Sequence, residues 1–255
     1  MLKGVRQRRI SQIIQAQGQA SVNELARRFH VTEMTIRRDL GDLDAQGFVQ
    51  RIHGGAISTD RRPIPFEPPM LERMKQEADA KRRIGRAVAA MVSEGENVFL
   101  GSGTTTLAVA EALSGRSNLT VITNALTIAN ALVASNLITL IVVGGFLRRS
   151  ELSLIGHFAE TTLHDLRVDK VIMGIRGIDA NYGLTSDHFQ ELMTDRAIMA
   201  IGESVIIVAD HTKFGHVAAS RTAPVNAAKV IVTDSLVPDD VAAGVEALGV
   251  RVIRV

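Results

Sequence analysis

Two stretches of the sequence carry groups that could bind anions. In the first, Arg37 and Arg38 stand side by side in TIRRDL. In the second, Gly101 and Gly103 enclose Ser102, and three threonines follow, in GSGTTT. Guanidinium groups form paired hydrogen bonds with phosphates, and backbone N–H groups at a helix N-terminus also bind them. The chain therefore has two candidate anion sites, and each needs its own elements to position it.

The first stretch is expected on a helix with one apolar side. Thr32 suits the N-cap, and Gly47 suits the position just after the last turn. Successive helical residues are about 100° apart. One side of this helix is therefore apolar and must face a small core, and it carries Ile36, Leu40 and Leu43. The opposite side and its flanks carry Met34, Thr35, Arg37 and Arg38.

A second helix precedes this one. Ser21 and Glu24 have the spacing of a capping box, which predicts a helix over SVNELARRF, and the turn HVT follows it. Two helices joined in this way are typical of helix-turn-helix proteins, whose second helix enters the major groove of DNA. Arg38 suits a guanine edge, and the other polar groups of that helix suit phosphates.

A hairpin is expected after these helices, in FVQRI-HGG-AI, around a Gly-Gly turn. It would lie on DNA as a wing. We predict DNA contacts by Ser21, Thr32, Glu33, Met34, Thr35, Arg37, Arg38, Arg51 and His53. The alternative is that the two arginines are merely solvated, with Asp42 paired to Arg38. The capped helices, the basic N-terminus and the glycine hairpin favour the DNA interpretation.

Charge is unevenly distributed along the 255 residues. The net charge is only +2, but residues 1–62 hold 11 Lys and Arg against 6 Asp and Glu. A basic first quarter suggests a polyanion-binding module joined to a different body. The absence of cysteine excludes disulfides and thiolate metal sites. The longest apolar run, LITLIVVGGFL, is too short to cross a membrane, and no signal peptide is recognised, so we expect a cytoplasmic protein.

The composition divides the chain into three parts. Residues 1–57 are expected to form a winged helix-turn-helix domain. Residues 58–75 hold four of the six prolines and are expected to be a linker. Residues 76–255 begin with a helix and then alternate helical segments with seven apolar runs: NVFLG, LTVITN, ITLIVVGG, KVIMGI, SVIIVAD, KVIVTD and VRVIRV. Such runs suit strands buried on both faces, which predicts a doubly wound, mostly parallel α/β sheet.

The GSGTTT stretch follows the first of these strands and begins a helix. Its glycines allow a sharp turn and a close approach to a ligand, and its hydroxyls add hydrogen-bonding groups. It is not a P-loop, because no Gly-Lys-Ser/Thr follows, and it lacks the third glycine of a dinucleotide fingerprint. One small phosphate is the ligand that it suits.

Ligands of doubly wound sheets lie beyond the carboxyl ends of the strands. Several strands here end in glycine or polar residues that could converge there. Cations and N–H groups would hold a phosphate, and carboxylates and amides would hold sugar hydroxyls. The candidates are Gly101, Ser102, Gly103, Thr104, Thr105, Thr106, Thr123, Asn124, Gly144, Gly145, Arg148, Arg176, Asp179, Asp210 and Lys213.

The stretch SVNELARRFHVTEMTIRRDLGDLDAQGFVQRIHGGA resembles the N-terminal signature of the DeoR family of bacterial transcription regulators. Residues 76–235 resemble the sensor domain of the same family through GSGTTT, SLIG, GLTS and TKFG. The resemblance implies a repressor with a sensor fold similar to ribose-5-phosphate isomerase and CoA-transferase-like proteins. It also implies that residues 102–106 and Lys213 hold a phosphorylated sugar.

Two other functions would need different features in the sequence. A sugar-phosphate isomerase fused to a helical domain would need a carboxylate base, for which Asp179 or Glu191 could serve. The stretch GIDANYGLTSD lacks the paired acids and following lysine of the isomerase pattern. A metal sensor would need clustered ligands, and no ligand pattern is formed by His30, His53, His157, His164, His188, His211 and His216.

We therefore expect a regulator of transcription rather than an enzyme, with a phosphorylated sugar as effector and no cofactor or metal. Its partners would be double-stranded operator DNA and a small phosphorylated metabolite. An operator with two half-sites needs two helix-turn-helix domains. A homodimer is therefore the smallest assembly expected, and a homotetramer would also meet this requirement. The proline-rich linker and the helix over residues 78–92 are the expected route between effector and DNA.

Overall fold

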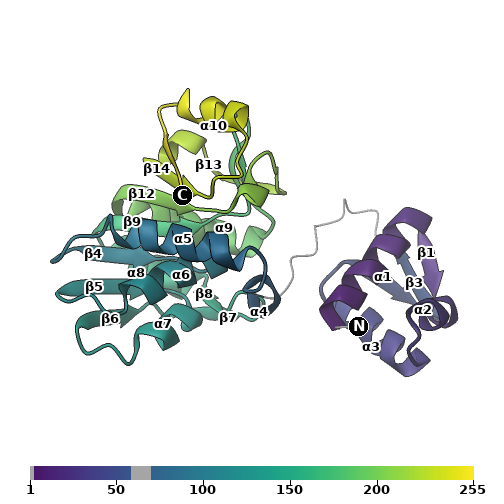
Figure 1. Ribbon diagram of the computed structural model, residues 1–255. Coiled ribbons are helices and arrows are strands. Elements are labelled where there is room, and N and C mark those ends of the chain that lie inside the picture. The colour runs from purple at the N-terminus through teal and green to yellow at the C-terminus, as the bar shows by residue number, and fades with distance from the viewer. Residues whose placement is uncertain (1–2, 59–69) are drawn as a thin grey trace. The chain divides into compact units, whose positions relative to one another are not determined.

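The computed structural model describes residues 3–58 and 70–255, and the chain forms two compact units (Figure 1). The N-terminal unit spans Met1–Pro68 and the C-terminal unit spans Pro69–Val255. Most of the predicted linker, residues 59–69, lies outside the described residues. A helix long and apolar enough to cross a membrane is not found in the described part of the chain.

The N-terminal unit packs three helices against a small antiparallel sheet of order β1-β3-β2. Its elements are α1 (Lys3–Gln17), β1 (Gln19–Ser21), α2 (Val22–Phe29), α3 (Glu33–Ala45), β2 (Val49–Ile52) and β3 (Gly55–Ser58). All three helices contribute to the core, which includes Ile10, Ile14, Leu25, Ile36, Leu40 and Leu43. The predicted apolar side of α3 is therefore confirmed.

Local hydrogen bonds begin the helices where the sequence predicts. The Ser21 hydroxyl accepts from the backbone N–H of Glu24 at 3.2 Å, and the Thr32 hydroxyl accepts from that of Thr35 at 3.2 Å. These bonds satisfy N–H groups that have no partner inside the helix. Helix α3 ends before Gly47, whose φ of 78° is left-handed.

The hairpin differs from the prediction in its turn. Ile52 pairs with Gly55, so the two turn residues are His53 and Gly54 rather than two glycines. Gly55 instead lies in β3, where a side chain would collide with the carbonyl oxygen of Ala20 on β1. The close approach of these two strands therefore requires glycine. The sequence does not reveal β1, because three residues are too few to show alternation.

A buried ion pair fixes α1 against α3. The Nε atom of Arg6 donates to Asp39 Oδ2 at 2.6 Å, and both side chains are almost completely buried. The Gln7 amide donates to the other Asp39 oxygen at 3.3 Å. In TIRRDL the aspartate thus faces inward, whereas Arg37 and Arg38 are exposed.

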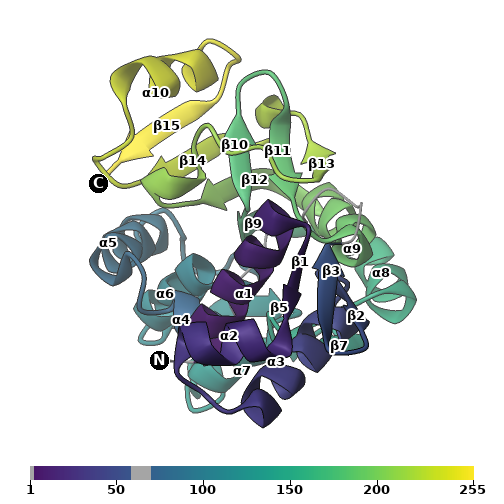
Figure 2. The same ribbon diagram turned by 90° about the vertical axis from the view of Figure 1, so that its right-hand side faces the viewer.

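A seven-stranded sheet of order β15-β14-β12-β9-β4-β5-β6 forms the C-terminal unit (Figures 1 and 2). Its strands are β4 (Asn97–Leu100), β5 (Leu119–Thr123), β6 (Ile138–Val142), β9 (Val168–Gly174), β12 (Gly202–Val208), β14 (Val230–Thr233) and β15 (Arg251–Arg254). Every pairing between them is parallel, and the seven strands correspond to the seven apolar runs. The predicted fold, a helix-turn-helix unit followed by a mostly parallel α/β unit, is confirmed.

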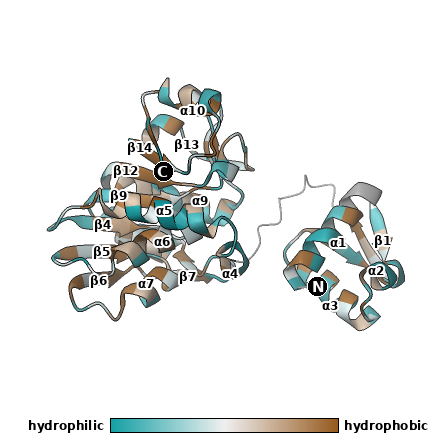
Figure 3. Ribbon diagram, viewed as in Figure 1, coloured by the Kyte–Doolittle hydropathy of each residue, from teal (hydrophilic) through white to brown (hydrophobic). Residues whose placement is uncertain are grey.

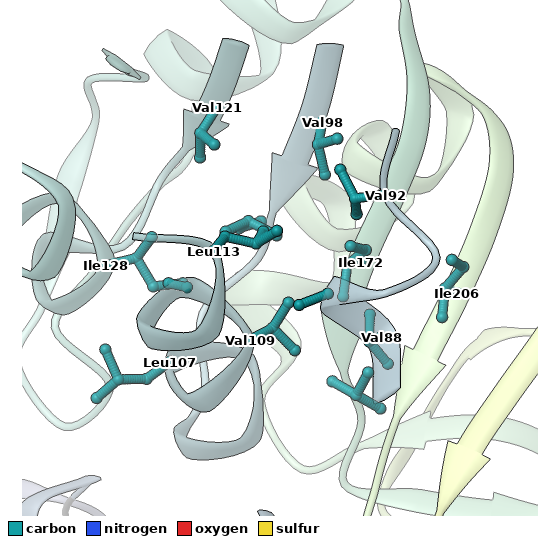
Figure 4. Packing of buried hydrophobic residues seen from close by; sticks show 14 of the residues in the cluster. Val88, Val92, Val98, Leu107, Val109, Leu113, Val121, Ile128, Ile172 and Ile206 are labelled. Atoms are coloured by element: carbon teal, nitrogen blue, oxygen red, sulfur yellow. The ribbon is translucent and has the colours of Figure 1, made fainter. Parts of the chain in front are cut away.

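Helices cover both faces of this sheet. One face packs against α5 (Ala78–Ala89), α6 (Thr104–Leu113) and α7 (Leu126–Leu132) through a core that Figure 4 shows, including Val88, Val98, Val109, Leu113 and Ile172. The other face packs against α8 (His157–His164), α9 (Phe189–Ala200) and α10 (Asp239–Glu246) through residues such as Phe99, Leu163 and Ile207. In Figure 3, α5 carries hydrophilic and hydrophobic residues together, as expected for a helix with one buried side.

Shorter elements surround the sheet. They are α4 (Met70–Arg73), β7 (Phe146–Arg148), β8 (Ser153–Ile155), β10 (Gly177–Asp179), β11 (Gly183–Ser186), the 3₁₀ turn η1 (His211–Lys213), β13 (Ser220–Ala223) and the 3₁₀ turn η2 (Val225–Ala227). Helix α4 falls within the residues assigned to the linker. Met70 is nevertheless buried, and its N–H donates to the carbonyl oxygen of Ser150 at 3.0 Å. This end of the linker segment therefore packs on the C-terminal unit.

Helices α5 and α6 lie side by side and run in the same direction (Figures 1 and 2). A Cβ atom added at Gly85 on α5 would lie 2.5 Å from the carbonyl oxygen of Ala108 on α6. At the C-terminal ends of both helices, Arg116 Nη2 donates to the carbonyl oxygen of Ala89 at 3.2 Å. The backbones are therefore in contact, and this contact fixes the register between the helices.

Replacing Gly85 by alanine should lower the free energy of unfolding by about 1–3 kcal/mol, because the new methyl group forces two packed helix backbones apart. Urea denaturation followed by circular dichroism would measure the change. Gly115→Ala is the matched control, because no heavy atom lies within 4 Å of a Cβ added there. Equal stability of the two variants would contradict the close packing of α5 on α6.

Candidate functional site

The exposed side of α3 carries the arginine pair. Met34 is 75% exposed, and Arg37 and Arg38 are exposed as well. Arg37 donates to Glu33, one turn earlier, at 3.1 Å. Both partners of this pair are about half exposed, so the pair contributes little to stability and leaves the arginine available.

Asp42 lies one turn after Arg38, and its closest cationic partner is Lys3 at 2.8 Å. The hydrogen bond from Lys3, and to a smaller extent the charge of Arg38, hold the pKa of Asp42 below its usual range. The alternative that Asp42 and Arg38 form the ion pair of this helix is thus not the arrangement seen, because α1 supplies a nearer cation.

The other predicted DNA-binding residues lie at helix ends and on the hairpin. The hydroxyls of Thr32 and Thr35 are 2.9 Å apart at the N-terminus of α3, and Ser21 caps α2. Arg51 is exposed on β2, where its backbone N–H donates to Asp44. His53 is exposed in the turn. The N-terminal unit therefore offers hydroxyls, helix N–H groups and exposed cations at the predicted positions.

The order of strands reverses between β4 and β9. From β4 the chain builds outward through β5 to β6, and it then returns to place β9 on the other side of β4 and continues to β12, β14 and β15. In open parallel sheets, ligands bind beyond the carboxyl ends of the strands at such a reversal. The loop after β4 is residues 101–103, which lead into α6.

This loop lies close against β9. A Cβ atom added at Gly174, the last residue of β9, would lie 3.6 Å from the carbonyl oxygen of Ser102 and 3.7 Å from Thr106 Oγ1. The Thr106 side chain is fully buried, and its hydroxyl has no hydrogen-bond partner. An unpartnered buried hydroxyl costs free energy unless a ligand or water satisfies it.

Helix α6 begins directly after the loop. Gly103 has a φ of 131° and accepts the first helical hydrogen bond, from Leu107. The backbone N–H groups of Thr104, Thr105 and Thr106 precede that bond and have no acceptor within the helix. With the positive end of the helix dipole, they suit an anion.

The last residue of β5 and the residue after it both form structural hydrogen bonds. The Thr123 hydroxyl donates to the carbonyl oxygen of Leu100 at 2.7 Å, which ties β5 to β4. The Asn124 amide donates to the carbonyl oxygen of Leu154 at 3.0 Å. The Oδ1 atom of Asn124 is buried and without a partner, so this amide has spare acceptor capacity.

After β6 the two predicted glycines differ in their surroundings. A Cβ atom added at Gly145 would lie 2.7 Å from the carbonyl oxygen of Ile155, so the β7–β8 hairpin requires glycine there. No heavy atom lies within 4 Å of a Cβ added at Gly144. Arg148, at the end of β7, forms an ion pair with Glu191.

Glu191, at the start of α9, links three segments. It accepts from Arg148, from the Ser153 hydroxyl at 3.1 Å and from the Ser102 hydroxyl at 3.5 Å. It therefore connects the loop after β4 to the β7–β8 hairpin. Asp195 lies one turn further along α9. Burial and the nearby Glu191 carboxylate raise the pKa of Asp195 well above its usual range, against the opposing effect of Arg148.

Two further predicted residues have hydrogen-bond partners close by in the sequence. Arg176, after β9, donates to the buried carboxylate of Asp187 at 2.9 Å. Asp179 accepts from the backbone N–H groups of Asn181 and Tyr182 at 2.8 and 2.9 Å, and so stabilises the turn between β10 and β11.

The turn η1 follows β12 and carries the predicted lysine. Asp210 is 2% exposed and accepts from the Thr212 N–H at 3.0 Å, and Lys213 lies half-buried at the end of the turn. Asp234, the residue after β14, accepts from the His211 N–H at 2.8 Å. Burial alone would raise the pKa of Asp234, but its hydrogen bonds from the backbone N–H groups of His211 and Leu236 hold it below its usual range.

Sequence reasoning missed Lys81 on α5. Its side chain is 6% exposed, and its pKa responds to Asp210 and Lys213, so the three charges are neighbours. A signal exists in the sequence, because Lys81 shares a helix side with Ile84 and Val88 at spacings of three and seven residues. A lysine in line with core residues is a candidate buried cation.

The carboxyl edge of the sheet thus brings together the loop after β4, the Glu191–Arg148 pair, the turn η1 and Lys81. Thr123, at the end of the neighbouring strand β5, and Asn124, which follows it, adjoin them. The hairpin of Asp179 is joined to this edge through Gly215, whose N–H donates to the carbonyl oxygen of Ile178 at 2.9 Å.

Comparison with known proteins matches both units. Residues 6–62 match the family described as the DeoR-like helix-turn-helix domain, and residues 76–235 match the DeoR C-terminal sensor domain. The glycerol-3-phosphate regulon repressor of Escherichia coli is 36% identical over 230 residues, which cover 90% of this chain and 88% of that protein. The transcriptional repressor AccR of Agrobacterium fabrum is 35% identical over 232 residues, which cover 90% and 89%.

Solved structures give weaker matches. Ribose-5-phosphate isomerase A from Neisseria gonorrhoeae is 18% identical, with a TM-score of 0.38 over 52% of each chain. The delta subunit of eIF2B from Chaetomium thermophilum is 14% identical, with a TM-score of 0.44 over 63% of this chain and 57% of that one.

Asp195→Asn should raise the melting temperature at neutral pH. Because the pKa of Asp195 is raised on folding, the stability that its protonated form contributes is present at low pH and is lost as pH rises from about 4 through the raised pKa. Asparagine does not ionise, so the advantage of the variant should grow between pH 5 and pH 8. Differential scanning calorimetry across that range measures it.

Asp165→Asn serves as the control for this measurement, because the Asp165 side chain is 86% exposed. It should melt like the wild type at each pH. An Asp195→Asn protein that is less stable than the wild type at pH 8 would show that the ionised carboxylate is needed in the folded state.

Proposed function

The chain belongs to the DeoR family of transcriptional regulators, and from this premise we propose that it represses genes of carbohydrate catabolism until a phosphorylated sugar binds its C-terminal unit. The observation that carries the proposal is the sheet edge at the strand reversal, where an unpartnered buried hydroxyl, helix N–H groups and lysines gather. Such a set suits a small phosphate ester.

The N-terminal unit would bind the operator through α3. Arg38 and Met34 would face base edges in the major groove, with Arg38 on a guanine. Thr32, Thr35 and Arg37 would hold phosphates, and the hairpin would lie on the backbone with Arg51. The support is that Met34, Arg37 and Arg38 are exposed while the apolar side of the same helix is buried.

The C-terminal unit would hold the effector at the carboxyl edge of its sheet. The phosphate would lie at the N-terminus of α6, between the loop of residues 101–103 and Lys213. Sugar hydroxyls would face Asn124 and Asp210, which offer an amide and a carboxylate. The names of relatives support the chemical class, since one represses a glycerol-3-phosphate regulon.

The matched family and the named relatives are regulators of transcription rather than enzymes. The geometry also gives no support to a sugar-phosphate isomerase. Both proposed bases are engaged, since Glu191 accepts from Arg148 and two hydroxyls, and Asp179 stabilises its own turn. An isomerase base needs a free carboxylate beside the substrate.

We further propose that the protein acts in the cytoplasm as a homodimer or homotetramer. One helix-turn-helix unit covers one half-site, and an operator with two half-sites needs two copies. Effector binding would then favour one arrangement of the copies over another by its difference in affinity for them.

Arg38→Ala should weaken operator binding by about 1–3 kcal/mol and relax the preference at one base pair. The loss follows from removing a bidentate contact to a guanine edge. Gel-shift titration against an operator series with single base changes measures both effects. Arg251→Ala is the control, because Arg251 is an exposed arginine on β15, far along the sequence from the proposed interface. This variant loses the same charge and should bind the operator as the wild type does.

A panel of phosphorylated sugars should contain a compound that raises the melting temperature of the protein. Binding at about 100 times the dissociation constant adds about 2.7 kcal/mol, which corresponds to a rise of roughly 5–10 °C in a unit of this size. Lys213→Ala should abolish this rise and leave operator binding intact. Lys229→Ala, at the opposite edge of the sheet before β14, is the matched control.

If no phosphorylated sugar in the panel raised the melting temperature, the proposal that the effector is a phosphorylated sugar would be contradicted. A Lys213→Ala protein that still responds to the compound would show that the effector binds elsewhere in the C-terminal unit.

A further inference from the structure

The ammonium group of Lys81 is buried yet retains hydrogen-bonding capacity. Its Nζ atom donates to the carbonyl oxygens of Arg73 at 2.8 Å and Gln76 at 2.5 Å. An ammonium carries three protons, so two carbonyls leave one donor for another acceptor. A lysine that is 6% exposed, with neutral acceptors only, is uncommon because burial disfavours its charge.

The packing of α5 on α6 places Lys81 beside the start of α6. The two helices run in the same direction, with Gly85 against Ala108 and Ala89 against the residues that follow α6. One turn back from Gly85 is Lys81, and one turn back from Ala108 is Thr104. Lys81 therefore lies level with the first residue of α6, where the helix N–H groups are free.

The charges around Lys81 come from three other segments. The charges of Asp210, which precedes the turn η1, and Lys213, at its end, influence Lys81, as do those of Arg73 on α4 and Glu77 before α5. Burial, supported by the two cations, lowers the pKa of Lys81 to about 8 despite the opposing carboxylates. Arg73 is itself paired with Glu151, so three cations face three carboxylates here, and the feature that suits a further acceptor is the remaining Lys81 proton rather than an excess of charge.

A second feature independently points to a ligand here. The hydroxyl of Thr106, in the first turn of α6, is fully buried and has no partner. It approaches Gly103 and Gly174, and so faces the loop at the strand reversal. A buried donor of this kind, a helix N-terminus and a buried cation together make a built site for a phosphate.

We propose that Lys81 binds the phosphate of the effector together with the N-terminus of α6, and that its titration makes effector affinity depend on pH. The inference rests on the proposed function. It adds Lys81 as a residue that binds the ligand, and pH as a condition that changes the affinity for the ligand. Lys81 joins a segment, residues 73–76, that also packs on the C-terminal unit through the Arg73–Glu151 ion pair.

The sign of the pH dependence follows from the charge of the ligand. A phosphate dianion beside Lys81 favours the ammonium form, so the pKa of Lys81 is higher in the complex than in the free protein. The contribution to affinity is complete below the free-protein pKa of about 8 and is lost as pH rises toward the pKa of the complex.

The test is isothermal titration calorimetry of inorganic phosphate, predominantly a dianion in this range, into the full chain at pH 8.0 and pH 9.5. Wild-type affinity should be roughly tenfold weaker at pH 9.5, because few Lys81 side chains remain charged there. Lys81→Met should bind at least tenfold more weakly at pH 8.0, with little further change at pH 9.5. Lys75→Met, at an exposed position in the same segment, should match the wild type.

Wild-type phosphate affinity that stays constant between the two pH values overturns the assignment, whether or not Lys81→Met folds. So does a folded Lys81→Met protein that binds phosphate as the wild type does. Absence of phosphate binding by the wild type also overturns it. The melting-temperature panel tests the proposed function separately. A sugar phosphate that stabilises the protein, together with a phosphate affinity that does not depend on pH, would contradict the role of Lys81 and leave the proposed function standing.

Discussion

The parallel pairing of β4 with β9 is the contact on which the C-terminal unit depends. It sets Phe99 opposite Val171 and lies where the strand order reverses. Both strands are covered on both faces, so a slip of one residue would move every side chain of a strand to the wrong core. Hydrophobic burial therefore fixes the register, and the register fixes how closely the loop after β4 approaches Gly174. The polar site is positioned by apolar packing.

Most of the architecture could be predicted because it follows from local patterns. Apolar runs marked all seven strands, and cap residues such as Ser21 and Thr32 marked helix starts within one residue. The loops that meet at the sheet edge follow from the topology, since parallel strands end on the same side. Short elements gave no such signal, as β1 and the position of the His53–Gly54 turn illustrate.

Side-chain partners could not be predicted, because they join residues far apart in the sequence. The pairing of Arg148 with Glu191 spans 43 positions, and that of Arg6 with Asp39 spans 33. Nothing local distinguishes an arginine that meets a ligand from one that meets a carboxylate. Lys81 is the opposite case, since its neighbours in space are charged although its neighbours on the helix face are apolar. Only the register between α5 and α6 relates it to the loop after β4.

The two sides of α3 meet different physical constraints. Ile36, Asp39 and Leu40 are held by the core and by α1, so changes there alter folding. Met34 and Arg38 do not pack in the core, because their side chains are exposed. Substitution at these outward positions would therefore leave the core of the N-terminal unit intact, so the exposed chemistry of α3 can change independently of its folding.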